Sequence, residues 1–233
     1  MPHRVDHDAR RSRLVEAAMR VVATDGFAAV SVRRVAAEAG HSPGSLRYFF
    51  PTQESLIEAA LAHVTELAAE RLVGRIVAFE NADAGRVVDA ACALIEELLP
   101  LDETRRAEWR IYGALSEPSV ATSALARWRK AGWAGTRHQC RRVVRGLTGG
   151  GVNGAAARVA DPPPDAEAIL AAAERLAASP DDTVEQRAAG LHALIDGLGA
   201  QLVQFPDMVT ERAARATVRR AVTDLARVLS PDL

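Results

Sequence analysis

Residues 31–50, SVRRVAAEAGHSPGSLRYFF, contain two short helix-forming runs separated by a tight turn. Ser31 and Ser42 each precede a run at the position of a helix cap, and Pro43 suits a first helical position because its missing N–H costs nothing there. Gly40 supplies the left-handed residue with which many helices end. Neither run is long enough to be stable alone in water, so each must pack against other parts of the chain.

The second run has two different faces. At about 100° per residue, Leu46 and Phe50 share a side with Pro43, and we expect them to pack on the preceding helices. The opposite side carries donors for phosphates and base edges, which favours a helix-turn-helix with this helix in the DNA major groove. Spacing alone leaves a tight helical corner in a core as the alternative. The outward residues are Gly44, Ser45, Arg47 and Tyr48, with Phe49 at the boundary.

The rest of the chain also shows helical periodicity, and no segment alternates as a strand would. Leu14, Ala17, Ala18 and Val21 form one face of a first helix over residues 10–25. We therefore predict an all-α protein in which a glycine- and proline-rich segment, 148–165, forms a mobile or extended connection. The further predicted helices span about 53–78, 84–99, 103–116, 120–147, 165–178, 183–204 and 210–229.

Charge is unevenly distributed along the chain. The net charge is −1, but residues 1–50 hold eight arginines against five acidic residues. A basic N-terminal part on an acidic remainder suggests that only this part binds an anion, although a split of this size also arises by chance. Aromatic residues make up only 4% of the sequence, and alanine with short aliphatic residues suits close-packed helices better than sheets.

Several classes of protein have no signal in the sequence. We see no secretory signal and no apolar run of membrane-spanning length. The two cysteines, Cys92 and Cys140, are too few for a disulfide framework. We therefore expect a cytoplasmic protein without a membrane partner. Cys140 lies among arginines, which lower thiol pKa values, so redox sensing and a spectator role both stay open. His3 and His7 have a metal-ligand spacing but lie beside two aspartates, and we expect no metal and no cofactor.

The stretch RSRLVEAAMRVVATDGFAAVSVRRVAAEAGHSPGSLRYFFPTQESLIEAAL resembles the DNA-binding head of the TetR family of transcriptional repressors, over about residues 8–68. The resemblance implies an all-α homodimer with a head at 8–68, a motif at 31–50 and a ligand-binding and dimerisation domain at 69–233. By position it implies DNA contacts from Ser45, Tyr48 and Phe49, with Arg33 near the backbone. The complete set of candidate DNA-binding residues is Arg33, Ser42, Gly44, Ser45, Arg47, Tyr48 and Phe49.

Two residues depart from the family pattern. Arg47 stands where members typically have tyrosine, and Gln53 stands where a lysine commonly opens the fourth helix and touches phosphate. Losing the lysine should weaken phosphate binding, and Arg47 could replace it because arginine donates bidentately to phosphate or to guanine. Further phosphate candidates at the start of the first helix are Arg10, Arg11 and Arg13, for which a solvated cationic helix start is the alternative.

The three tryptophans all fall in the middle helices, where they could line a mostly apolar ligand cavity or pack in an ordinary core. The candidate ligand-binding residues are Glu108, Trp109, Tyr112, Trp128, Trp133 and His138.

The last two long helices carry an apolar stripe, and in the family the corresponding pair meets its copy in a four-helix bundle. An internal hairpin is the alternative. The candidate dimerisation residues are Leu191, Leu194, Ile195, Leu198, Leu202, Val218, Val222 and Leu225.

These features together favour a homodimeric repressor that occupies a palindromic operator and leaves it when a small molecule binds the C-terminal domain. A second hypothesis is a helical enzyme or ligand carrier that keeps the head as a scaffold, which the lack of a catalytic constellation disfavours. A third is a regulator that activates, or that answers to a protein partner.

Overall fold

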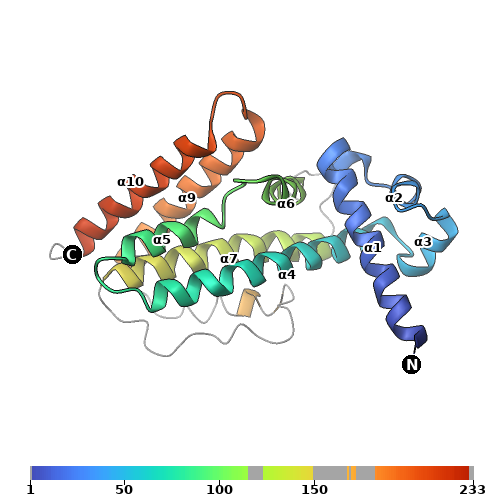
Figure 1. Cartoon of the computed structure of the whole chain (residues 1–233), viewed down its shortest axis with the longest axis horizontal. Helices are drawn as coiled ribbons and strands as arrows, with labels where there is room; N and C mark the ends of the chain where they lie inside the picture. Colours follow the sequence, from blue (N-terminus) through green and yellow to red (C-terminus); the bar gives the residue numbers. More distant parts are fainter. Residues whose placement is uncertain (1, 115–122, 149–166, 168, 172–181, 231–233) are drawn as a thin grey trace. The chain divides into compact units, whose positions relative to one another are not determined.

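The computed structural model describes residues 2–114, 123–148, 167, 169–171 and 182–230, and within these residues regular structure is helical throughout (Figure 1). The predicted all-α class is confirmed. The predicted connection at 148–165 and most of the predicted helix at 165–178 lie outside the described residues. The elements are α1 (Pro2–Asp25), η1 (Phe27–Ala29), α2 (Val32–Glu38), α3 (Pro43–Phe49), α4 (Gln53–Glu80), α5 (Val87–Glu96), α6 (Glu103–Ala114), α7 (Ser123–Leu147), α9 (Asp182–Gln204) and α10 (Glu211–Leu229).

The chain divides into two compact units. Unit 1 comprises Met1–Val64 and Glu103–Arg129, and unit 2 comprises Thr65–Asp102 and Lys130–Leu233. Helices α4 and α7 each contribute residues to both units, and α6 belongs to the unit that contains α1, α2 and α3. Unit 1 therefore includes a helix that the sequence-based boundary assigned to the second domain.

The core of unit 1 forms where α1 packs on α2 and on α6. Leu14, Leu46 and Leu56 are completely buried there, and Phe50 is 1% exposed. The predicted inward positions of Leu46 in α3 and of Phe50 directly after it are therefore confirmed. Arg110 of α6 adds a polar tie, because its Nη1 donates to the carbonyl oxygen of Ala23 at 2.9 Å.

The two short helices are closed by local interactions at each end. The Ser31 hydroxyl accepts from the Arg34 backbone N–H at 3.2 Å, and the Ser42 hydroxyl accepts from the Ser45 N–H at 3.1 Å. Both predicted N-caps are thus confirmed. Gly40 has φ +68°, which confirms its predicted left-handed conformation after α2.

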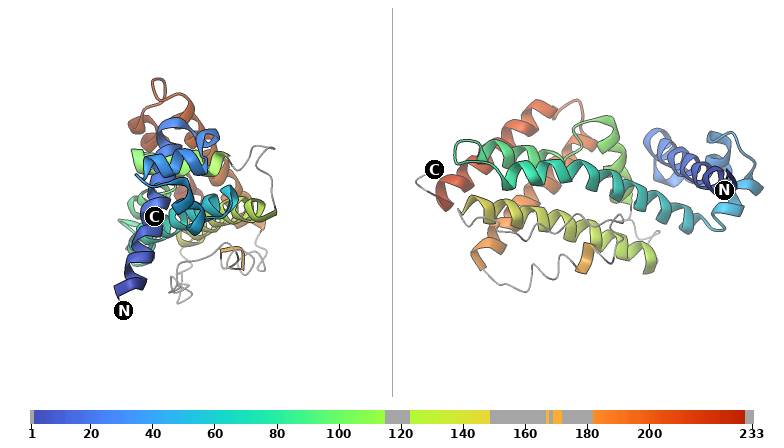
Figure 2. Two further views of the ribbon diagram at one scale, coloured as in Figure 1. Left: turned by 90° about the vertical axis from the view of Figure 1, so that its right-hand side faces the viewer. Right: turned by 60° about the horizontal axis from the view of Figure 1, so that its bottom comes forward.

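Unit 2 is held together by α10, which packs on α5 and on α9 (Figure 2). Apolar side chains fill the contacts, and arginines on α10 pair with acids on α5. Arg219 Nη1 lies 2.7 Å from Asp89 Oδ1, and Arg215 pairs with Glu96. These exposed pairs fix the register of α10 on α5 more than they stabilise the fold, because each exposed pair contributes at most about 1 kcal/mol.

Both cysteines lie in the interior of unit 2. Burial raises the pKa of the Cys92 thiol to about 11 and that of Cys140 to about 12. Arg137 lowers the pKa of Cys140, as the sequence suggested arginines would, but the effect of burial is larger. The hypothesis of an activated thiol at Cys140 is therefore wrong.

Among the described residues, no helix is both long and apolar enough to cross a membrane.

Candidate nucleic-acid interface

Helix α3 turns one side into the core and the other to solvent. Leu46 is buried, whereas Gly44 and Arg47 are exposed and the Tyr48 side chain is 74% exposed. Phe49 is half-buried at the edge. The same short helix therefore anchors itself through a leucine and presents a guanidinium and a phenol outward, and both can donate to phosphates or base edges.

Two arginines in the N-terminal helices of unit 1 form ion pairs with acidic residues of the same unit. Arg34 lies 2.8 Å from Asp25 and 3.2 Å from Glu38, and Arg20 lies 3.1 Å from Glu38. The hydrogen bond from Arg34 lowers the pKa of Asp25, and that from Arg20 is the main cause lowering the pKa of Glu38. This network neutralises its own charges and ties α1 to α2.

Arg33 and Arg47 are placed differently. Both are exposed, and neither pairs with a carboxylate among the described residues. Their charge is therefore available to an anion. At the start of α1, Arg13 Nε donates to the Ala9 carbonyl at 3.3 Å, and the Arg11 guanidinium lies 5.2 Å from the centre of the Phe50 ring.

The start of α4 is fixed by two sets of hydrogen bonds. The Ser55 N–H donates to the Thr52 hydroxyl oxygen at 3.0 Å, and the Thr52 N–H donates to the Ser55 hydroxyl oxygen at 3.3 Å, a reciprocal capping arrangement. Gln53 Nε2 donates to the carbonyl oxygen of Val30 at 2.7 Å. The sequence marked Gln53 only as a lost cation, whereas the structure gives its side chain a role in holding α4 beside the segment before α2.

Two protein-family models match the chain, one at its N-terminal helices and one at its C-terminal helices. Residues 14–60 match the model of bacterial regulatory proteins of the tetR family, and residues 165–227 match the C-terminal model of the BetI-type transcriptional repressor. The chain belongs to the TetR family. The first match contains α2, α3 and the beginning of α4, and the second contains α9 and most of α10.

Individual relatives agree with this family assignment. The HTH-type transcriptional regulator PksA of Bacillus subtilis is 40% identical over 72 residues, which is 31% of this chain and 35% of that protein. The chain thus matches about a third of that relative's length. Two solved regulators share the fold. One from Rhodococcus sp. Rha1 has 22% identity and a TM-score of 0.66, covering 94% of this chain and 96% of that one. The other, from Saccharomonospora viridis in complex with choline, has 21% identity and a TM-score of 0.64, covering 93% and 96%.

The residues proposed from sequence to bind a ligand in this TetR-family chain fall into both units. Glu108, Trp109, Tyr112 and Trp128 belong to unit 1, and Trp133 and His138 belong to unit 2. Glu108 and Trp128 are buried, Trp109 and Tyr112 are half-buried, and Trp133 is 55% exposed. The structure therefore does not bring the six side chains together within a single unit.

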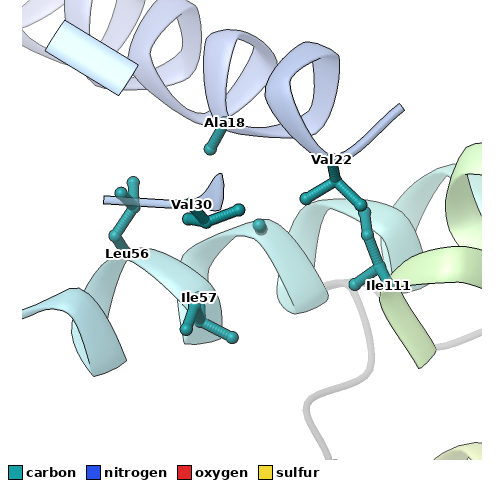
Figure 3. A pocket seen from close by; sticks show the side chains of 7 residues that line it. Ala18, Val22, Val30, Leu56, Ile57 and Ile111 are labelled. Atoms are coloured by element: carbon teal, nitrogen blue, oxygen red, sulfur yellow. The ribbon is translucent and has the colours of Figure 1, made fainter. Parts of the chain in front are cut away.

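A small cavity lies inside unit 1, where side chains of α1, α4 and α6 meet beside Val30 (Figure 3). Its volume is about 10 Å³, and its lining is entirely apolar. A space of this size holds at most about one water molecule, and the apolar walls offer that water no hydrogen bonds. None of the six candidate ligand residues lines it. The lining residues are Ala18, Val22, Val30, Leu56, Ile57, Ala60 and Ile111.

Unit 2 contains a polar cluster that the sequence reasoning missed. The rings of Trp133 and His192 lie 5.3 Å apart, and the Arg137 guanidinium lies 4.9 Å from the Trp133 ring centre. Arg137 Nε donates to His192 Nδ1 at 3.1 Å, and Arg137 also pairs with Glu185 at 2.9 Å. A histidine inside an apolar stripe was the available signal. Asp196, 3.6 Å from the His192 Nε2, lies on the same helix, but Trp133 and Arg137 come from α7.

The candidate dimerisation stripe needs correction. Six of its eight residues are buried within their own unit, and Leu194 and Leu225 are half-buried. Periodicity correctly identified an apolar face, but that face is already covered by helices of the same chain, including the α5–α10 and α9–α10 contacts. A contact between copies would have to use the other sides of α9 and α10. The buried six are Leu191, Ile195, Leu198, Leu202, Val218 and Val222.

Proposed function

We propose that this protein is a DNA-binding transcriptional regulator, and specifically a homodimeric repressor that leaves a palindromic operator when a small molecule binds. The observation that carries the proposal is the outward side of α3, where Arg47 and Tyr48 are exposed and Arg47 has no carboxylate partner among the described residues. Family membership supports the same reading, since the match at residues 14–60 covers this helix.

The physical basis for DNA binding separates into two parts. Arg33, with Arg10 and Arg13 on α1, would neutralise phosphates and release counterions, which gives affinity that falls steeply with salt. Arg47 and Tyr48 would contact base edges in the major groove, where a bidentate arginine–guanine pair contributes about 1–3 kcal/mol of discrimination. Arg20 and Arg34, already paired with acids, are expected to contribute little.

Dimerisation follows from the need to read two half-sites. A two-fold symmetric protein holds two recognition helices about one helical turn of DNA apart, which matches the symmetry of a palindrome. The outward side of α9 is suited to close helix packing, because it carries small residues, Gly190, Ala193 and Gly197, that are all exposed in the single chain. Small side chains let two helices approach closely without displacing large groups.

Release by a ligand requires only that the ligand prefer a conformation that does not fit the operator, by a few kcal/mol. An organic cation is the first class to test, since a structural neighbour binds choline and aromatic faces attract quaternary ammonium groups. Trp109 and Trp128 would offer aromatic faces to such a cation and Glu108 an acidic side chain, and all three residues belong to unit 1.

The decisive experiment selects a binding sequence from a pool of random DNA duplexes with the wild-type protein, and then measures Kd for variants on the selected duplex. Arg47→Ala and Tyr48→Ala should each weaken binding by about 10- to 100-fold. Arg20→Ala is the matched control, because it removes an arginine that is paired with Glu38, and its Kd should change little. Enrichment of no sequence, or wild-type affinity in both α3 variants, would refute DNA reading by α3.

The ligand part is tested separately with choline as the probe. If choline is an inducer, it should release the selected duplex and change tryptophan fluorescence over one concentration range. Trp109→Ala should weaken the response to choline while leaving DNA binding by the free protein intact. Release with unchanged fluorescence, and with Trp109→Ala responding normally, would place the ligand site elsewhere.

A further inference from the structure

Three aromatic rings meet at the end of α3, and one of them comes from the beginning of α1. The His7 ring centre lies 4.6 Å from that of Phe49 and 5.9 Å from that of Tyr48, and Tyr48 and Phe49 lie 5.2 Å apart, nearly perpendicular. Offset and edge-to-face arrangements at these distances are the favourable geometries for aromatic pairs. The cluster lies outside the leucine-rich core, since His7 and Tyr48 are both exposed.

A second contact on the same side of α1 extends this support. Arg11 follows His7 by one helical turn, and residues four apart share a helix face. The Arg11 guanidinium lies 5.2 Å from the centre of the Phe50 ring. The first turns of α1 thus rest on the C-terminal end of α3 through two side chains. Both lie before residue 14, where the match to the tetR-family model begins, so the general family pattern does not account for this contact.

Such a contact matters because α3 is short and Tyr48 protrudes. The helix has seven residues, and a side chain that is 74% exposed loses rotational freedom when it binds a base edge. A ring packed beside it limits that freedom before DNA arrives. We infer that His7 is a positioning residue for DNA recognition, which orients Tyr48 and Phe49 and thereby sharpens discrimination between operator sequences. This inference rests on the proposed function, because it assigns His7 a part in the same DNA contact.

The contact itself can be tested without DNA. The chain contains two tyrosines, Tyr48 and Tyr112, so selective tyrosine labelling gives a simple NMR spectrum. His7→Ala should move the ring resonances of Tyr48, because a neighbouring ring current is lost, and should leave those of Tyr112 unchanged. An unmoved Tyr48 signal would overturn the inference whether or not the protein binds DNA, which separates its failure from that of the proposed function.

The effect on recognition is measured on the selected duplex and on duplexes with single base-pair changes. His7→Ala should reduce the ratio of the affinity for the selected duplex to the affinity for a changed duplex. The expected reduction is about three- to tenfold, the range that follows from losing a favourable aromatic pair. His7→Phe should restore the ratio, since it keeps a ring at this position. If His7 only stabilised α1, the melting temperature would fall while the ratio stayed the same, and that result would overturn the inference.

Arg10→Ala serves as the comparison on the same helix. It removes an exposed charge, so it should weaken binding to all duplexes alike and lower the slope of log K against log salt by about one. If His7→Ala behaved in this uniform manner, His7 would be a phosphate contact and the positioning role would be refuted. A reduced ratio of affinities between the selected and changed duplexes, with an unchanged salt slope, would support the positioning role of His7.

Discussion

The side-chain amide of Gln53 donates a hydrogen bond to the backbone carbonyl of Val30, with 2.7 Å between nitrogen and oxygen. This bond joins the first turn of α4 to the residue that precedes the cap of α2. In this chain, therefore, a neutral side chain with an internal partner occupies the position at which the family commonly places a phosphate-binding lysine.

Gln53→Lys should separate the two roles of this position. The lysine cannot reproduce the amide geometry, so the free energy of unfolding should fall by about 1 kcal/mol, the contribution of a typical hydrogen bond. The added charge should nevertheless strengthen binding to duplexes of any sequence and steepen the salt dependence. Urea unfolding and DNA titrations at several salt concentrations measure the two effects. An unchanged salt slope would show that residue 53 does not approach phosphate.

Gly146 on α7 marks a close approach to α4 within unit 2. A Cβ at this position would lie under 3.0 Å from two ring carbons of Phe79, which is itself buried. Gly146→Ala should therefore lower the free energy of unfolding by about 1–3 kcal/mol through overpacking. Gly74→Ala on α4 is the control, because a Cβ there meets nothing within 4 Å and alanine favours a helix by up to about 1 kcal/mol. Shifts of the same sign in both variants would contradict this account.

His192 should make stability depend on pH. Burial is the largest cause that lowers the pKa of His192, Asp196 acts in the opposite direction, and Arg137 lowers it further. The folded protein therefore binds this proton less readily than the unfolded chain, and the associated stability is present above the ordinary imidazole pKa of 6.5 and is lost as the pH falls below it.

Urea unfolding between about pH 7.5 and pH 5.5 measures this dependence. The wild-type protein should lose stability toward the acid end, whereas His192→Asn, which cannot titrate, should show a flatter profile whatever its absolute stability. The carboxylates with lowered pKa values, such as Glu185, release their contribution only below about pH 4.5, outside this window. Parallel profiles for the two proteins would exclude His192 as the source.

The corrected position of the apolar stripe changes how dimerisation is tested. Ala193 is exposed on α9, so Ala193→Arg should leave helicity intact while placing an unpaired charge in the proposed contact, where it would cost about 3–5 kcal/mol. Leu198 is only 8% exposed within its own chain, so Leu198→Arg should instead disrupt unit 2. Sedimentation velocity and circular dichroism distinguish these results. A wild-type monomer at micromolar concentration would contradict the homodimer.

Local features of this fold could be predicted from the sequence because their causes are local. The caps at Ser31 and Ser42 and the left-handed turn at Gly40 each depend on residues within one helical turn. The inward position of Leu46 follows from helical spacing in the same way. These signals were sufficient to place α3 and its exposed face.

Features that depend on distant segments could not be predicted. Periodicity showed that α9 has an apolar face, but it could not show that this face, including Leu198, is covered within the chain itself. His7 lies in a charged stretch without apolar spacing, and its contact with Phe49 arises only when α1 and α3 pack together. Two partners of His192, Trp133 and Arg137, likewise come from another helix, α7. In each case the missing information was which element covers a given face.

The burial of Cys92 and Cys140 has a practical consequence. With thiol pKa values of about 11 and about 12, neither side chain carries appreciable thiolate near neutral pH in the folded protein. A maleimide should therefore react with them only when unit 2 opens, and the rate of modification measures how often unit 2 opens. A cysteine introduced at an exposed position, for example Gly44→Cys on α3, would accept a fluorophore selectively while both natural cysteines stay in place.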